Sequence, residues 1–342
     1  MDGLDLAYVE FTEEGGIWTF DLKNWTTIGY SDEWFVDLRN AQRIVKHELE
    51  ILHVDYGTYL GNACLKFIEE HNLSPDFIAS HGHTVFHQPE IKFTYQLGDG
   101  QALANACGFK TVNDFRSLDV MLGGQGAPLV PIGDRHLFES YPVCLNLGGF
   151  ANISFEKNAE RIAFDVCPVN TILNIYANSL GKEYDDNGDL AASGQLIPEM
   201  LQELNNLSYY HEPAPKSLSR EWLDQIFTPI LKRSLGSDID KLHTLCIHVA
   251  QQVHRATKDV AAEEGAELLI TGGGALNKFL VECISHEANL TIHVPEKPIV
   301  EFKEALIFAF LGVLKIRNEV NCLRSVTGAS RDSSCGVISN PQ

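Results

Sequence analysis

The chain has 342 residues, a formal net charge of −20 and a hydrophobic content of 44%. This length and apolar content suffice for two folded domains, each with its own core. The negative charge argues against a role on nucleic acid or at a membrane surface, since both are polyanions. Eight cysteines without CxxC spacing indicate reduced thiols and a cytoplasmic protein. We find neither a signal peptide nor an apolar run long enough to span a bilayer.

The first third of the chain predicts a hairpin followed by helices. Residues 4–11 and 17–20 have the pattern of strands joined by a glycine turn. Apolar residues at helical spacing predict helices over 38–52 and 56–71. Residues 77–80 predict a short buried strand that ends in a polar cluster.

The rest of the chain alternates between strands and helices. Apolar runs at 143–149, 162–165 and 268–274 each break into glycine or an acidic residue. Helices are expected over 171–179, 220–233, 242–264 and 304–318. This alternation predicts the α/β class, in which ligands bind at strand ends. We expect a domain boundary near 128–134.

Residues 114–131 combine two acids, an arginine and a Gly-Gly-Gln-Gly-Ala-Pro turn. Asp114, Arg116 and Asp119 bring polar groups that a core holds only when they are paired, and the glycines let the backbone approach a ligand. An ordinary tight turn with solvated charges is the alternative. We interpret the stretch as part of a binding site.

Two glycine loops follow predicted strands, at 147–150 and 271–274. Free N–H groups in such loops can hold a phosphate, although strand-to-helix turns also need glycine for geometry alone. Asp165 is expected at a strand tip, the usual place for a general base. A helix N-cap is the alternative for this residue, because Pro168 suits the first turn of a helix.

Three further groups are less specific. His81, His83 and His87 have a spacing that could bind a metal, but Gly82 makes a substrate-contacting loop the better interpretation. The acidic run 185–189 lacks the glutamate of a calcium loop and is interpreted as a solvated turn. Glu304 begins an apolar helix, either as a partner of the helix dipole or as a group that faces a cleft.

In this order, the motifs resemble those of the anhydro-N-acetylmuramic acid kinases, a family of the sugar-kinase and actin superfamily. The resemblance covers nearly the whole chain. Its motifs are residues 1–5, 80–89, 96–99, 114–131, 145–154, 164–165, 184–185, 192–194, 271–277 and 327–329. The Gly-Gly-Gln-Gly-Ala-Pro segment is specific to the family, whereas the glycine loops occur across the superfamily.

The resemblance implies two actin- or sugar-kinase-like (ribonuclease H-like) α/β domains with ATP and Mg²⁺ in an interdomain cleft. These would comprise residues 1–130 and 131–322, with 323–342 returning to the first. The implied reaction is hydrolysis of the 1,6-anhydro bond of anhydro-N-acetylmuramic acid with phosphorylation of O6. It gives N-acetylmuramate 6-phosphate for peptidoglycan recycling, and the family suggests a cytoplasmic homodimer.

The resemblance also implies roles for individual residues. Asp165 would be the general base that activates water, and Thr84, Arg116 and Glu304 would bind the sugar. ATP would be bound by Asp2, Gly3, Asp5, Gly148, Gly149, Asn152, Gly272, Gly273, Gly274 and Asn277. No protein ligand for a metal is implied.

Several positions depart from the family pattern. His83 replaces a glutamine, Gly100 replaces a proline, and Val166, Cys167 and Val169 replace a threonine and two glycines. The family also places a strand ending in Met-Ser-Gly-Thr-Ser before the residues that match 1–5. We therefore expect weak ATP binding and slow turnover for the chain as written, and recovery when it is extended upstream.

Two other functions remain open at this point. One is a non-catalytic member of the family that binds sugar without efficient phosphoryl transfer. The other is a plain glycosidase that uses Asp165 with a second acid and needs no ATP, which leaves the loop at 271–277 without a purpose. Dependence of turnover on a nucleotide separates these functions.

Overall fold

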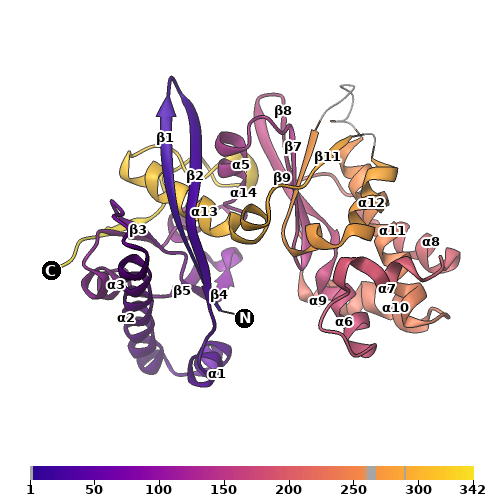
Figure 1. The fold of residues 1–342 in the computed structure, drawn as a ribbon, viewed down its shortest axis with the longest axis horizontal. Coiled ribbons are helices and arrows are strands. Elements are labelled where there is room, and N and C mark those ends of the chain that lie inside the picture. The colour runs from indigo at the N-terminus through magenta and orange to yellow at the C-terminus, as the bar shows by residue number, and fades with distance from the viewer. Residues whose placement is uncertain (1–2, 259, 261–266, 289) are drawn as a thin grey trace. The chain divides into compact units, whose positions relative to one another are not determined.

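The computed structural model describes residues 3–258, 260, 267–288 and 290–342. Helices and strands alternate along much of the chain, which confirms the predicted α/β class (Figure 1). The chain divides into two compact units: unit 1 comprises Met1–Leu137 and Phe302–Gln342, and unit 2 comprises Phe138–Glu301. The boundary at 301/302 lies inside a long helix, whereas we had expected the return to unit 1 at residue 323.

Unit 1 begins with the expected hairpin, although its strands are longer than predicted. The strands and helices of its first part are β1 (Leu4–Glu14), β2 (Ile17–Ile28), α1 (Asp32–Asn40), α2 (Lys46–His71), β3 (Ile78–Ala79), β4 (His83–Gln88), β5 (Phe93–Leu97), α3 (Gly100–Cys107), β6 (Thr111–Asn113), α4 (Ser117–Met121) and α5 (Pro131–Leu137). Its last elements are α13 (Lys297–Ile316), which starts in unit 2, α14 (Arg324–Thr327) and β12 (Val337–Ser339). The predicted helix at 38–52 is interrupted, because α1 ends at Asn40 and α2 starts at Lys46.

The strands of unit 1 form several separate small sheets. β1 pairs antiparallel with β2, β4 pairs antiparallel with β5, and β6 lies between β3 and β12. Helix α2 packs on α3 through two glycines: a Cβ at Gly57 would lie 2.5 Å from the carbonyl oxygen of Asp99, and one at Gly61 would lie 2.6 Å from the Cβ of Ala106. Absence of side chains there lets the two helix backbones approach closely.

Unit 2 is built on one mixed sheet with the order β11-β10-β7-β8-β9. Its strands and helices are β7 (Val143–Leu147), β8 (Phe150–Lys157), β9 (Glu160–Pro168), α6 (Asn170–Ser179), α7 (Asp189–Ala192), α8 (Pro198–Asn205), α9 (Arg220–Trp222), a π-helical turn (Leu223–Phe227), α10 (Thr228–Arg233), α11 (Asp238–Thr257), β10 (Glu267–Thr271), α12 (Lys278–Glu287) and β11 (Thr291–His293). The predicted helix at 242–264 runs partly outside the described residues.

The core of unit 2 forms where the sheet meets α11. Val143, Leu145 and Leu147 lie on one face of β7 and are fully buried, and Cys144 on the opposite face is buried as well, as expected for a strand covered on both faces. Helix α11 starts at a capping box formed by Ser237 and Asp240. Its apolar residues at helical spacing, Leu242, Leu245, Val249 and Val253, are buried in the same core.

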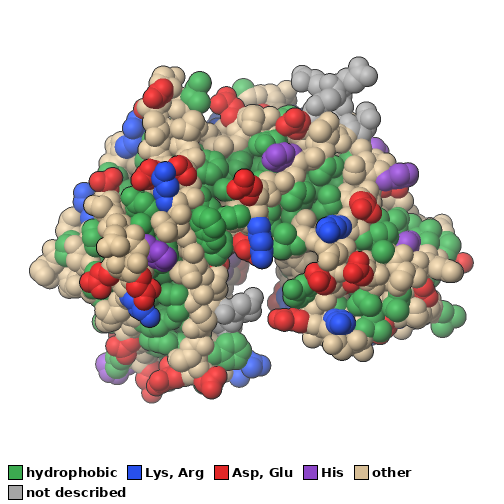
Figure 2. Space-filling view, viewed as in Figure 1, with side chains coloured by type: hydrophobic (Ala, Val, Ile, Leu, Met, Phe, Trp, Pro, Cys, Tyr) green, Lys and Arg blue, Asp and Glu red, His purple; other side chains and the backbone are tan. Residues whose placement is uncertain are grey.

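Surface composition agrees with the sequence. On the face shown in Figure 2, acidic side chains are interspersed with hydrophobic and basic ones. Within the described part of the chain, no helix combines the length and the apolar character needed to cross a membrane.

Candidate functional site

Asp165 lies within β9, three residues before the end of the strand. The pairing of β8 with β9 shifts register between Ala151 and Asn152, so that Val166 is an extra residue opposite them. Such a bulge bends the strand and redirects a neighbouring side chain. Helix α6 starts at Asn170 with Val169 at its N-cap, so the alternative of Asp165 as a helix cap is wrong. Pro168 ends the strand instead of opening the helix.

Two N–H donors hold the Asp165 carboxylate. The side-chain amide of Asn152 donates to Oδ1, and the backbone N–H of Leu218 donates to Oδ2 at 2.8 Å. Burial raises the pKa of Asp165, while the two hydrogen bonds favour the charged form and lower it. The carboxylate is therefore a fixed proton acceptor with a pKa above that of an ordinary aspartate.

The segment 209–218 fixes the backbone of Asp165 as well. The hydroxyl of Tyr209 donates to the carbonyl oxygen of Asp165. The N–H of Asp165 in turn donates to the carbonyl of Lys216 at 3.3 Å. Both contacts are made by a segment far from β9 in sequence, so the position of the carboxylate depends on how this segment folds over the edge strand.

The two predicted glycine loops lie next to each other at the C-terminal ends of β7 and β10, two inner strands of the sheet in unit 2. β7 and β10 are parallel, with Asn146 opposite Thr271, so the loops that follow them leave the sheet side by side. A Cβ on Gly274 would lie 2.7 Å from the Cβ of Leu147, and Gly272 has a φ of +80°. These two glycines are required for packing within the chain, as the alternative interpretation held.

Gly273 differs from its neighbours. A Cβ placed on Gly273 would have its nearest atom, Nδ2 of Asn170, at 3.7 Å. In the other loop, a Cβ on Gly149 would lie 2.6 Å from Oγ1 of Thr171, and one on Gly148 would lie 3.3 Å from Nδ2 of Asn146. Gly273 is thus the position of the turn where an added Cβ would make no close contact with the described protein atoms.

Asn152 and Asn277, both expected near ATP, have partners within the protein. Asn152 bonds to Asp165. The side chain of Asn277 caps α12 by accepting the N–H of Leu280 at 2.9 Å, and a Cβ on Gly188 would clash with it at 2.2 Å. Asn277 therefore fixes the start of the helix that follows the glycine turn.

In unit 1, Arg116 joins the polar cluster after β3 to the glycine-rich turn. Its Nε donates to Nε2 of His81 at 2.9 Å, and its Nη1 donates to the carbonyl of Gly126 at 2.6 Å. Burial lowers the pKa of Arg116, while the charge of Glu304 raises it. The structure thus brings together Arg116 and Glu304, the two charged residues that we expected at the sugar.

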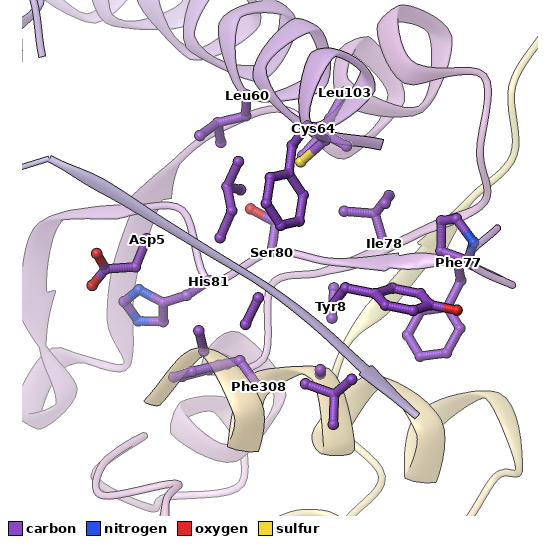
Figure 3. A pocket seen from close by; sticks show the side chains of 18 of the residues that line it. Asp5, Tyr8, Leu60, Cys64, Phe77, Ile78, Ser80, His81, Leu103 and Phe308 are labelled. Atoms are coloured by element: carbon purple, nitrogen blue, oxygen red, sulfur yellow. The ribbon is translucent and has the colours of Figure 1, made fainter. Parts of the chain in front are cut away.

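Glu304 lies in the third turn of α13, which starts at Lys297. The expectation that it begins the helix is therefore wrong, and the dipole of that helix end is too far away to explain it. Its neighbour Lys303 forms a buried ion pair with Asp134, with 2.7 Å between Nζ and Oδ1. Glu304 instead borders a cavity together with Asp5 and His81 (Figure 3).

Asp119 has a structural role in the Gly-Gly-Gln-Gly-Ala-Pro turn. Its Oδ2 accepts the N–H of Gly126 at 2.7 Å, and its Oδ1 accepts the hydroxyl of Thr327 at 2.8 Å. The thiol of Cys322 also lies 3.1 Å from Oδ1. This 1% exposed carboxylate therefore ties the turn to the C-terminal segment, and the expectation of solvated charges in an ordinary turn is wrong for it.

The remaining predicted residues lie at several places. In unit 1, Thr84 in β4 accepts from the amide of Gln96 at 3.5 Å, and Asp5 in β1 accepts from the hydroxyl of Thr27 at 2.5 Å. Gly3 lies against the backbone of Ile28, and Asp2 lies outside the described residues. In unit 2, Asp185 is not a solvated turn residue: its buried carboxylate accepts the N–H groups of Leu190 and Ala191, both at 2.9 Å.

Sequence reasoning missed the residues that position Asp165 from a distance. Tyr209 and Leu218 are 44 and 53 residues away along the chain, and no local pattern pointed to them. Asn170, whose Nδ2 donates to the carbonyl of Leu147 at 3.1 Å, lies in the same motif as Asp165. Its place two residues after the conspicuous Pro168 was a signal that could have found it.

The described residues contain no group of three or more His, Cys, Asp or Glu side chains that could hold a metal ion. His81 bonds to Arg116, and His87 Nδ1 lies 3.1 Å from the hydroxyl of Thr94. Kinases commonly bind Mg²⁺ through the phosphates of the nucleotide with only one or two carboxylates.

Several known proteins are similar to this chain over most of its length. The family model for anhydro-N-acetylmuramic acid kinase matches residues 1–341. The kinase of that name from Francisella tularensis subsp. novicida is 33% identical, with 99% of this chain and 95% of the relative covered. The one from Aliivibrio fischeri is 38% identical over 76% of this chain and 74% of the relative, and the one from Actinobacillus pleuropneumoniae is 31% identical over 99% and 95%.

Similarity to solved structures is much weaker. A hexokinase from Schistosoma mansoni in complex with glucose aligns with 86% of this chain and 82% of that one, at 10% identity and a TM-score of 0.33. That score is too low to support an argument. The family model and the relatives, each covering most of the chain, are sufficient: the chain belongs to the anhydro-N-acetylmuramic acid kinase family.

Proposed function

We propose that this protein uses ATP to convert anhydro-N-acetylmuramic acid into N-acetylmuramate 6-phosphate, with Asp165 as the general base. Membership of the kinase family supports the overall reaction. The observation that carries the role of Asp165 is its buried carboxylate, aligned by the amide of Asn152 and the N–H of Leu218. A base in this setting is fixed in direction and has a raised pKa, which makes it a better proton acceptor.

The chemistry assigned to Asp165 is a single proton transfer. The oxygen of a water molecule bonds to the anomeric carbon of the sugar, and Asp165 takes the proton of that water. The bond between the anomeric carbon and O6 breaks, and its electron pair remains on O6. O6 then forms a bond to the γ-phosphorus of ATP, and ADP leaves with the electrons of the broken P–O bond. Water, sugar and ATP thus give the phosphorylated sugar, ADP and one proton, which Asp165 releases to solvent.

The nucleotide is assigned to the glycine loops of unit 2. Gly273 supports this assignment, because it has room for a side chain that the sequence does not supply. Backbone N–H groups of Gly148, Gly149 and Gly273 would face the phosphates, while Gly272, Gly274 and Asn277 maintain the shape of the turn. Mg²⁺, when bound with the phosphates, neutralises charge that develops during transfer.

The sugar is assigned to Arg116, Glu304 and Thr84 of unit 1. Arg116 is buried and already directed by His81 and Gly126, so its remaining donors are oriented before a ligand binds. Preorganised donors of this kind bind polar groups at a low cost in side-chain entropy. We further propose that the protein is a cytoplasmic homodimer that acts in peptidoglycan recycling.

Asp165→Asn tests the assignment. The substitution keeps the size of the side chain and removes the basic carboxylate, so we expect turnover to fall by about 10²-fold or more. ATP binding, measured separately by calorimetry, should stay within about twofold. Asp189→Asn, at an exposed acid on α7, is the matched control and should leave both quantities unchanged.

Three results would count against the proposal. Near-wild-type release of ADP by Asp165→Asn at saturating ATP and sugar would remove Asp165 from the chemistry. Cleavage of the anhydro bond by the wild-type protein without any nucleotide would point to a plain glycosidase. Tight sugar binding with no ADP release, under any nucleotide, would point to a non-catalytic binding protein.

A further inference from the structure

Helix α11 buries a row of polar side chains in the core of unit 2. Thr244, His248 and Gln252 follow one another at intervals of four residues and are 0%, 0% and 3% exposed. A buried polar side chain is costly unless it is hydrogen-bonded. Thr244 accepts the N–H of Ile197 at 2.9 Å, and the side-chain amide of Gln252 donates to Oδ1 of Asn205 at 2.6 Å. Two members of the row thus hold the start and the end of α8.

The proton positions on His248 follow from its neighbours. Nδ2 of Asn205 donates to Oε1 of Gln251 at 2.7 Å, so Oδ1 of Asn205 faces His248. Because that oxygen can only accept, Nδ1 of His248, which lies 2.8 Å away, carries the proton. Burial and the charge of Arg255 lower the pKa of His248 from 6.5 to about 3, so the imidazole is neutral. Nε2 is then an acceptor, and the hydroxyl of Tyr210 donates to it at 3.0 Å.

Tyr210 is the point at which the segment that precedes α9 is fixed to α11. Residues 208–211 form a single 3₁₀ turn, and the chain then forms neither helix nor strand until α9 starts at Arg220. A segment without a hydrogen-bond ladder of its own depends on side-chain contacts for its position. The bond from Tyr210 to the fully buried His248 therefore joins this segment to the core of unit 2.

The same segment holds Asp165. Tyr209, the residue before Tyr210, donates its hydroxyl to the carbonyl oxygen of Asp165. Nζ of Lys216 donates to the carbonyl of Tyr209 at 2.8 Å and lies 4.5 Å from the centre of its ring. The carbonyl of Lys216 accepts the N–H of Asp165, and the N–H of Leu218 donates to the carboxylate. A continuous series of contacts therefore leads from α11 to Asp165.

We propose that His248 is a positioning residue for the proton transfer at Asp165 and acts through the hydroxyl of Tyr210. The bond between Nε2 and this hydroxyl fixes the segment, and the segment keeps the N–H of Leu218 on Oδ2 of Asp165. When this N–H is displaced, the ionised carboxylate loses a donor and its direction is no longer fixed. The inference rests on the proposed role of Asp165 as the base.

Two other roles for His248 fit the contacts less well. A general acid or base exchanges protons with the substrate, whereas both nitrogens of this buried imidazole are bonded within the protein. A residue that only fills the core needs no polar atoms, and an apolar side chain of similar volume would fill it without the cost of burying an imidazole. The bond to Tyr210 is therefore the feature that the test must isolate.

A matched pair of substitutions separates the two nitrogens of His248. In His248→Gln the end of the side chain lies near the place of Nε2, so its amide oxygen can still accept from Tyr210. In His248→Asn the amide nitrogen lies near the place of Nδ1, so it can still donate to Asn205, but the acceptor for Tyr210 is lost. Tyr210→Phe removes the same bond from its other end. Ile284→Val, at a buried residue of α12 in the same core, is the control for a loss of packing alone.

Kinetics and hydrogen exchange are measured on the full chain. For His248→Asn and Tyr210→Phe we expect kcat to fall about fivefold or more, with KM for ATP within about twofold of the wild-type value. The acid limb of kcat/KM for the sugar should move to higher pH by about half a unit, because the ionised Asp165 is less well held. Amides at 216–219, followed by mass spectrometry without substrates, should exchange about tenfold faster. His248→Gln and Ile284→Val should match the wild-type protein in all these measurements.

The double variant with both His248→Asn and Tyr210→Phe should be no slower than either single variant, because both substitutions remove one bond. Independent, multiplying effects would overturn the proposal. Equal kinetic effects of His248→Gln and His248→Asn would also overturn it, since the acceptor for Tyr210 would then not matter. If His248 contributes to stability alone, the variants will lose stability in urea while the acid limb stays at the wild-type pH, which again overturns the proposal.

Asp165→Asn, measured alongside, separates this inference from the proposed function. Unchanged exchange at 216–219 in His248→Asn and Tyr210→Phe overturns the inference even when Asp165→Asn is inactive and the base is correctly assigned. Near-wild-type turnover by Asp165→Asn overturns the assignment of the base even when exchange at 216–219 is faster as expected, and it leaves no proton transfer for His248 to serve.

Discussion

Nε of Arg116 donates to Nε2 of His81 across 2.9 Å, so the imidazole of His81 must be neutral and must carry its proton on Nδ1. That Nδ1 lies 2.9 Å from the carbonyl oxygen of Gly82, which accepts a hydrogen bond from it. Burial and the nearby charge of Arg116 lower the pKa of His81 from 6.5 to about 4. A histidine next to an arginine is therefore used here as an acceptor that directs the guanidinium.

This relationship predicts how stability depends on pH. The pKa of His81 is lower in the folded state than in the unfolded state. The contribution of the neutral imidazole to the free energy of unfolding is therefore complete above about pH 6.5 and is lost as the pH falls toward about 4. The shift corresponds to about 3 kcal/mol at most. We expect His81→Gln, which keeps an acceptor for Arg116 but does not titrate, to flatten the fall in the free energy of unfolding between pH 6.5 and 4.

Urea titrations of both proteins at several pH values measure this difference. His248, buried in unit 2 with a pKa lowered to about 3, titrates in both proteins and cancels in the comparison. Parallel curves for wild type and His81→Gln would show that the imidazole is not neutral in the folded state.

Asn152→Leu should shift the pH dependence of catalysis. The Asn152 amide stabilises the ionised form of Asp165 and lowers its pKa. Without it, the pKa rises, and the acid limb of kcat/KM should move to higher pH by about one unit, since one unit equals about 1.4 kcal/mol and a hydrogen bond to a charge contributes about that much. Asn206→Leu, at an exposed asparagine, is the control. An acid limb at the same pH in both variants would contradict the role of Asn152.

Gly273→Ala should separate nucleotide binding from packing. The protein has room for the methyl group, whose nearest neighbour would lie 3.7 Å away, so the melting temperature should change by less than about 2 °C. If the turn faces ATP, KM for ATP should rise about tenfold or more. Gly29→Ala, where nothing lies within 4 Å of the new Cβ, is the control. An unchanged KM in Gly273→Ala would place the nucleotide elsewhere.

Asp119→Asn should destabilise the chain by about 3 kcal/mol, because an amide cannot replace a buried carboxylate among donors from Gly126, Thr327 and Cys322. Equilibrium unfolding in urea measures the loss. Asp55→Asn on the exposed side of α2 should change stability by less than about 0.5 kcal/mol. Equal stability of the two variants would mean that the turn is not held by this carboxylate.

Regular elements were the most predictable part of the fold. The hairpin β1–β2, the buried strands β7 and β10, and helices α6 and α11 follow from hydrophobic periodicity, because each buries a face that the pattern reveals. The break at residues 41–45 between α1 and α2 could not be predicted from hydrophobic periodicity, because the two helices have similar composition. The start of α13 at Lys297 was missed because we began the helix at Glu304, although Pro298 suits a first helical turn and was a signal for the earlier start.

The residues of the candidate site could be predicted from sequence motifs, but their contacts could not. Asp165 was placed on a strand from its apolar neighbours, but its bulge arises from pairing with β8, which no local window contains. Asp119 was read as part of a ligand site, whereas its partners Cys322 and Thr327 lie about two hundred residues further along the chain. The strand expected ahead of Met1 stays a prediction, as do the assigned roles at ATP and sugar.

The division of the chain has a consequence for its synthesis. Unit 1 needs Phe302–Gln342 as well as Met1–Leu137, and the ribosome makes all of Phe138–Glu301 in between. At a rate of synthesis of about 5–20 residues per second, α13 and Thr327 are made roughly ten to thirty seconds after the first part of unit 1. During this time the apolar side of α2 and the edge of β1 have no cover from α13. A nascent chain of this protein is thus exposed to aggregation until its last forty residues emerge, and chaperones that bind apolar segments would act on its first half.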